Sequence, residues 1–207
     1  MFPLGSALLP GEPLPLRIFE PRYRQMLTDC LTAAEHDGGS PRFGVVLIER
    51  GSEVGGGEVR FNTGTVAEID VLRRDADGGG TLTATGTDRF DVVEWLPDDP
   101  YPRARVVELS EPAPTAAEHT ALIELGARVH RLLESAVADG LLRTTTALPS
   151  FDDADLEVSG IFGWAARLPV GAADRQRLLE APDVAGRVAI FAEAVDGLDA
   201  MIRFRSG

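Results

Sequence analysis

The hydrophobic period of the sequence changes at the segment SEPAPT, Ser110 to Thr115. Before it, short runs rich in Val, Ile, Thr and aromatic residues are separated by glycines, a pattern typical of short strands. After it, apolar residues recur every three or four positions, as they do on one face of a helix. This change predicts an α+β fold, with a β domain over residues 1–111 and a helical domain over residues 112–207.

The first part is expected to form a barrel or curled sheet, because many short strands occur with few helices between them. A strand is predicted at Leu14 to Ile18, at a strand end or sheet edge because its prolines supply no N–H. The remaining β-type runs are 42–49, 64–72, 81–90, 90–96 and 103–109. The segment Asp75 to Gly80 is typical of a hairpin turn.

One helix is predicted within the first part. Pro21 suits the first helical position, and Glu20 complements the positive end of the helix dipole. Apolar side chains then recur at helical spacing and predict a helix that flanks or plugs the barrel; they are Tyr23, Met26, Leu27, Cys30 and Leu31.

The second part predicts a helical bundle. Thr115 and Glu118 have the spacing of a capping box, and the helix that they begin is expected to end near Gly140. Further helices are predicted at 153–168 and 173–181, and Asp183 is expected to cap the last one. This last helix carries a narrow apolar seam suited to packing on other helices: Val184, Val188, Phe191, Val195, Leu198 and Ile202.

Charge restricts the partners of this chain. The formal net charge is -13, so phosphate backbones and anionic lipids are repelled and nucleic-acid binding is disfavoured. All basic residues are Arg, which excludes Schiff-base lysine chemistry, a Ser-Lys dyad and the lysine of a P-loop. The single Cys forms no intrachain disulfide, and no signal peptide or membrane span is recognisable, so we expect a cytoplasmic protein.

No catalytic, cofactor-binding or metal-binding residues are predicted. His119 and His130 lie eleven positions apart on one predicted helix, and His36 is expected in a polar loop, so no zinc cluster forms. The sequence lacks G-x-S-x-G, and the glycine-rich run Gly51 to Val59 lacks the lysine of a phosphate-binding loop. Cys30 is expected to be a small buried hydrophobe, and both Trp95 and Trp164 core residues.

Several segments together resemble the N-terminal substrate-binding domain of Lon proteases. They are FPLGSALLPGEPLPLRIFEPRYRQMLTDCL, FGVVLI, GTVAEI, GTDRFDVVEW, YPRARVVEL and SGIFGWAARLPVGAADRQRLLEAPDVAGRVAIF. The resemblance covers nearly the whole chain. It implies a PUA-like β pseudo-barrel with one helix, followed by a C-terminal helical bundle.

The resemblance implies a non-catalytic protein-recognition module. Full Lon continues into an ATPase and a Ser-Lys peptidase, whereas this chain ends at Gly207 without a lysine, so neither activity is carried over and a stand-alone module is expected. Its expected partners are unfolded or apolar protein segments, which it engages alone or as an adaptor to a separate protease. Its oligomeric state is not specified by the sequence.

Candidate contacts for such partners are the apolar residues Phe2, Leu4, Leu8, Leu9, Leu14 and Leu16, although each is also suited to closing the barrel. An alternative is an RNA-binding PUA-like module with a local basic face of Arg17, Arg22, Arg24, Arg103 and Arg105, which the net charge opposes. A small-molecule pocket is a third alternative, with no positive support in the sequence.

Overall fold

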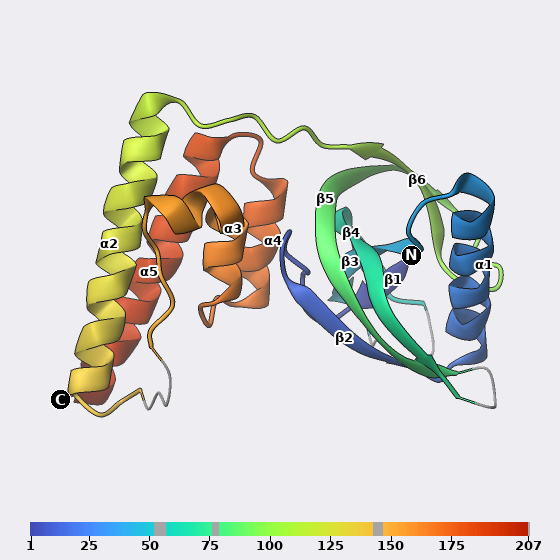
Figure 1. Ribbon diagram of the computed structural model, residues 1–207, viewed down its shortest axis with the longest axis horizontal. Helices are drawn as coiled ribbons and strands as arrows, with labels where there is room; N and C mark the ends of the chain where they lie inside the picture. The colour runs from blue at the N-terminus through green and yellow to red at the C-terminus, as the bar shows by residue number, and fades with distance from the viewer. Residues whose placement is uncertain (52–56, 76–78, 143–146, 207) are drawn as a thin grey trace. The chain divides into compact units, whose positions relative to one another are not determined.

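The computed structural model describes residues 1–51, 57–75, 79–142 and 147–206. The chain divides into two compact units, Met1–Ser110 and Glu111–Gly207, called here the β unit and the helical unit. This division lies beside the boundary of 111/112 expected from the change in hydrophobic period. A strand-rich part precedes a helical part, so the predicted α+β class is confirmed (Figure 1).

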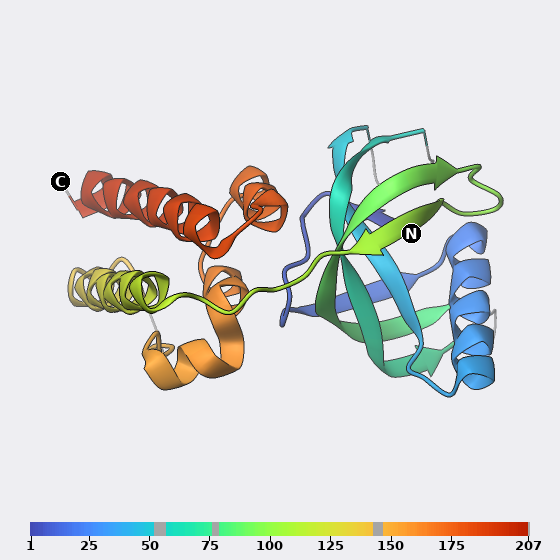
Figure 2. The same cartoon turned by 90° about the horizontal axis from the view of Figure 1, so that it is seen from above.

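The described residues of the β unit form six strands and one helix. In chain order they are β1 (Phe2–Leu4), β2 (Pro13–Ile18), α1 (Pro21–Asp37), β3 (Arg42–Arg50), β4 (Val59–Arg74), β5 (Gly80–Leu96) and β6 (Arg103–Glu108). The sheet order is β1-β3-β4-β5-β2, and β6 also pairs with β5. β1 is parallel to β3 and the other pairs are antiparallel. The result is a strongly curled mixed sheet (Figure 2).

The runs 81–90 and 90–96 form a single strand, β5, of 17 residues. Its first half pairs with β2 and its second half with β6, so the strand bends with the curl of the sheet. Gly86 allows the segment before β2 to lie close to β5, because a Cβ at this position would strike the backbone carbonyl of Leu9. The backbone N–H of Gly86 donates to the carbonyl of Glu12 over 2.9 Å, which joins the turn before β2 to β5.

The helix predicted after Glu20 is α1. Pro21 occupies its first turn, and Gly38 ends it in the left-handed conformation at φ 69°. The helix is longer than the apolar stripe, so His36 lies in its last turn and not in a loop. Tyr23, Met26 and Leu27 are buried in the core cluster of the β unit, as the stripe predicts. Figure 1 shows α1 beside the sheet.

The core of the β unit lies between α1 and the concave side of the sheet. It combines the first strand, the stripe of α1 and one face of β3, β4 and β5; its buried members include Phe2, Leu8, Ile18, Tyr23, Met26, Leu27, Phe43, Val45, Ala67, Ile69, Leu82 and Ala84. Residues of one face of an antiparallel sheet alternate along each strand, so the residues between them face outward. The expected turn at 75–80 has its centre, 76–78, outside the described residues, as do residues 52–56 of the glycine-rich run.

The described residues of the helical unit form four helices: α2 (Ala116–Ala138), α3 (Asp153–Ala166), α4 (Ala172–Glu180) and α5 (Val184–Ser206). The capping box that begins α2 is present, with Thr115 and Glu118 bonded reciprocally. Asp183 caps α5, accepting from the N–H of Gly186 over 2.7 Å. Among the described residues, no helix has the length and apolarity that spanning a bilayer requires.

The helix expected at 153–168 is interrupted. Gly160 has φ 61° and ψ -179°, a conformation almost restricted to glycine, so α3 consists of two helical segments that meet at this residue. The second segment ends at Ala166, before Leu168. The break allows the second segment to bury Trp164, which has 0% of its surface exposed.

Candidate functional site

Three of the candidate contacts lie inside the β unit. Leu8 and Leu9 are 4% and 0% exposed, and Phe2 is 9% exposed. Phe2 stacks on Tyr23 with ring centroids 4.2 Å apart, which fixes β1 against α1. In this structure these side chains close the barrel, and a partner does not reach them.

The other three candidates are half-buried. Leu4, Leu14 and Leu16 pack against the core cluster of the β unit. Leu16 also borders a shallow hollow on the outer side of β2, β4 and β5. This sheet hollow has a volume of about 390 Å³ and is lined by Pro15, Leu16, Arg17, Val71, Arg73, Thr81, Leu82 and Thr83.

The helical unit has an apolar groove beside the C-terminal ends of α2 and α5. All twelve of its lining residues are apolar: Val129, Leu132, Leu133, Ala136, Leu141, Leu142, Leu168, Pro169, Val195, Leu198, Met201 and Ile202. Its floor is core, because Val129 and Val195 are 0% exposed, whereas Met201 on its rim is 49% exposed. The volume of about 180 Å³ is smaller than the roughly 300–1,000 Å³ of small-molecule pockets. The groove therefore suits apolar side chains of a larger partner.

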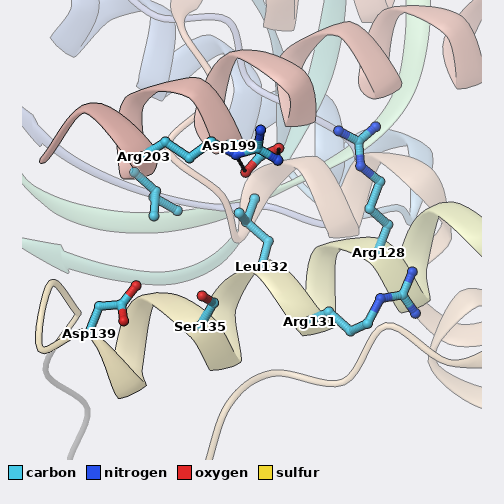
Figure 3. Close-up of a pocket in the computed structure, with 8 residues that line it drawn as sticks. Arg128, Arg131, Leu132, Ser135, Asp139, Asp199 and Arg203 are labelled. Carbon is cyan, nitrogen blue, oxygen red and sulfur yellow. Dashed lines mark hydrogen bonds and ion pairs between the residues drawn. The ribbon is translucent and has the colours of Figure 1, made fainter. Parts of the chain in front are cut away.

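A polar hollow lies between the same two helices, with Leu132 and Ile202 shared between both depressions (Figure 3). Arg203 and Asp199 on α5 are joined by a hydrogen bond of 2.7 Å. Arg128 on α2 pairs with Asp196. Most of its charges are thus neutralised within the protein. Such surface pairs contribute little to stability and do not mark a ligand site.

Three arginines of the alternative basic face bond to other groups of the protein. Arg22 pairs with Glu20 over 3.1 Å, and Arg105 pairs with Glu94 over 2.9 Å. Arg24 donates from Nε to the carbonyl of Phe19 over 2.9 Å. Arg17 differs from these three, since it lines the sheet hollow together with Arg73.

Two histidines, Cys30 and Tyr23 make structural contacts. His119 contacts Asp153 at 2.7 Å and His130 contacts Glu134 at 3.5 Å, both at the surface. Within the described ranges, no three His, Cys, Asp or Glu side chains gather as metal ligands would. Burial raises the pKa of the Cys30 thiol, which lowers its thiolate fraction and its reactivity. Burial also raises the pKa of Tyr23 to about 12, so this phenol stays neutral.

The groove was not predicted from the sequence. Leu141 and Leu142 follow the glycine that ends α2, and the N–H groups of both bond to the carbonyl of Ala136. Met201 falls outside the apolar seam of α5. The sequence contained two signals for this groove. One is the pair of leucines directly after the helix stop, and the other is the large apolar residue beside the seam. Neither reveals that the two helix ends meet.

A curled mixed sheet with one flanking helix, joined to a helical unit, is the architecture of Lon N-terminal domains. The Lon N-terminal domain protein from Xanthomonas campestris superposes with a TM-score of 0.60 at 26% identity, over 92% of this chain and 94% of that one. The N-terminal domain of a Mycobacterium avium complex Lon protease gives a TM-score of 0.59 at 19% identity, over 94% and 96% of the two chains.

The sequence profile of the ATP-dependent protease La (LON) substrate-binding domain matches residues 1–196. The chain belongs to this family. The resemblance inferred from its motifs is confirmed, and a role in substrate recognition follows from the family.

Proposed function

We propose that this protein is a non-catalytic recognition module that binds exposed apolar segments of unfolded polypeptides. It acts alone or delivers these segments to a separate protease. The observation that carries the proposal is the groove of the helical unit, whose lining residues all have apolar side chains. Such a surface in contact with water is costly unless a partner covers it for part of the time.

The groove rim supplies the contacts for the partner. Leu141 and Leu142 are each 38% exposed and Met201 is 49% exposed. Methionine and leucine side chains adapt to differing apolar shapes, which suits a surface that accepts many sequences. Because the contact area is small, we expect affinity in the micromolar range. The buried candidates Phe2, Leu8 and Leu9 are not proposed as contacts, and neither is Leu16, whose side chain packs against the core of the β unit.

Fluorescence anisotropy with a labelled unfolded probe tests this function. Reduced, carbamidomethylated α-lactalbumin is suitable, because it is acidic and is not drawn to this acidic protein by charge. We expect saturable binding that changes little with salt. Substituting Met201→Asp should weaken it roughly tenfold, since a charge then enters the apolar rim.

Val158→Asp is the matched control. Val158 lies on α3, is 87% exposed and is not part of the groove lining, so the same change in charge should leave binding as it was. Equal loss in both variants, or no binding by the unmodified protein, contradicts the proposal. Circular dichroism verifies that both variants remain folded.

A further inference from the structure

The outer face of the β unit carries two arginines in one row across the sheet. Arg17 on β2 and Arg73 on β4 both lie directly opposite Thr81 on β5. Side chains of directly opposite residues in antiparallel strands point to the same face. The three therefore form a transverse row, in which Thr81 separates two guanidinium groups.

The neighbouring row is apolar. Pro15 and Val71 both lie opposite Thr83, two positions along from the arginine row and therefore on the same face. Val71 is 54% exposed. The two rows line the sheet hollow, which Leu16 and Leu82 also border although their side chains pack toward the core on the other face.

The charge of this hollow is opposite to that of the chain. The net charge is -13, yet none of the eight residues that line the hollow is acidic. Other arginines among the described residues form ion pairs within the protein; they include Arg22, Arg60, Arg105, Arg128, Arg167, Arg177, Arg187 and Arg203.

Arg17 and Arg73 have no ion pair within the described part of the chain. Two acidic residues lie near the arginine row: Asp70 within β4, which accepts a hydrogen bond from Thr85 over 2.7 Å, and Asp75 directly after it. Asp75 has its backbone N–H bonded to the carbonyl of Gly79. Neither residue lines the hollow, so no described carboxylate neutralises its two guanidinium groups.

The spacing suits a carboxylate. Arg17 and Arg73 are two strands apart, about 9–10 Å across the sheet, so both long side chains reach an oxyanion held above Thr81. Guanidinium groups bind carboxylates with paired N–H donors, and the threonine hydroxyl is a further donor. An aliphatic side chain next to that carboxylate would rest on Val71 and Pro15.

We propose that the sheet hollow binds segments of polypeptide substrates in which an acidic residue neighbours an aliphatic one. This inference rests on the proposed function, because it names a class of substrate sequence. The segment lies across the face of the sheet and does not extend its edge. Pro13 and Pro15 of β2 supply no N–H, which disfavours addition of a strand there.

Two matched peptides with blocked ends and a fluorophore test the proposal on the full chain. One alternates leucine with aspartate and the other alternates leucine with asparagine. We expect the aspartate peptide to bind roughly three- to tenfold more tightly, as two exposed arginine–carboxylate pairs allow. The double variant Arg17→Gln, Arg73→Gln should remove this difference and leave the affinity for the asparagine peptide unchanged.

The double variant Arg42→Gln, Arg103→Gln is the control. Both residues are exposed on strands of the β unit and lie outside the hollow, and the change in net charge is the same. The control should retain the preference for aspartate. Equal loss in the two double variants shows a general charge effect and overturns the proposal.

The remaining outcomes separate this inference from the proposed function. If the unmodified protein binds both peptides equally, the proposed function stands and this inference fails. If it binds neither peptide, both fail. A short poly-uridine RNA serves as the competitor. If it displaces the aspartate peptide at lower concentration than the unlabelled peptide does, and only through Arg17 and Arg73, the hollow is a phosphate site and the proposal is overturned.

Discussion

Trp164 fixes the packing of the helical unit at the scale of single residues. Its ring is 0% exposed and meets Phe151 edge to face at 5.7 Å between centroids. Gly126 on α2 makes room for it, because a Cβ at this position would lie 2.6 Å from the tryptophan ring and would also strike the carbonyl of Phe151. The close approach of α2 to α3 thus depends on the absence of one side chain.

Gly126→Ala should lower the free energy of unfolding by about 1–3 kcal/mol, because ring and carbonyl must move to admit a methyl group. Gly197→Ala on α5 is the control, since a Cβ there meets nothing within 4 Å. It should raise stability by up to about 1 kcal/mol through helix propensity. Urea unfolding followed by circular dichroism measures both. A stable Gly126→Ala variant would contradict the packing described.

The structural roles of some single residues were predictable from the sequence, and those of others were not. The capping residues Thr115 and Asp183 were predicted correctly, because a cap bonds to backbone only a few positions away. The roles of Arg17 and Arg73 were not, because they depend on which strands are neighbours. Arg17 and Arg73 are brought together by strand pairing between distant parts of the chain, and such pairing leaves no local pattern in the sequence.

At the scale of elements, α3 depends on one carboxylate that bridges its break at Gly160. Asp155, in the first segment, accepts from Nε1 of Trp164 over 2.7 Å and from both terminal nitrogens of Arg167 over 2.7 and 2.9 Å. These donors lie on or just beyond the second segment. Hydrogen bonding from the Arg167 guanidinium is the main cause that lowers the pKa of Asp155.

This lowered pKa predicts the pH dependence. A carboxyl whose pKa is lower in the folded than in the unfolded state binds fewer protons when folded, so its contribution to stability is complete above the unfolded pKa. The contribution is lost as the pH falls through the folded pKa. Asp155→Asn should therefore lower the free energy of unfolding at neutral pH by about 1–2 kcal/mol, a value limited by partial exposure to water.

The difference in stability between the Asp155→Asn variant and the unmodified protein should begin to shrink as the pH falls below the ordinary aspartate pKa of about 4, and should vanish below the lowered pKa of Asp155. Glu157→Gln, at an exposed position of the same helix, should behave as the unmodified protein does. Urea titrations at several pH values provide the test. A constant difference between Asp155→Asn and the unmodified protein down to pH 2–3 would show that the carboxylate charge is not responsible.

The elements themselves were largely predictable. Hydrophobic period, proline and capping residues located α1, α2, α4 and α5 and most strands within a few residues. The continuity of β5 and the break in α3 were missed. Each is decided by tertiary contacts, with β2 and β6 on the two halves of β5 and with the buried Trp164 beyond Gly160.

At the scale of the whole molecule, two of the depressions on this acidic chain have a character that its net charge does not reveal. One is the apolar groove of the helical unit and the other is the sheet hollow with its two arginines. The motif resemblance led to the family and to a recognition role. The binding surface was not predicted, because apolar N-terminal residues that were candidate contacts, such as Phe2 and Leu8, fill the barrel.

Hydrogen exchange of the full chain, with and without saturating unfolded α-lactalbumin, tests the central claim most directly. If the apolar groove binds the unfolded chain, amide exchange should slow at the C-terminal end of α2 with Leu141 and Leu142, and around Met201 on α5. α4, which does not line the groove, should exchange as before and serves as the internal reference. Unchanged exchange at both helix ends, with the probe bound, would contradict the account.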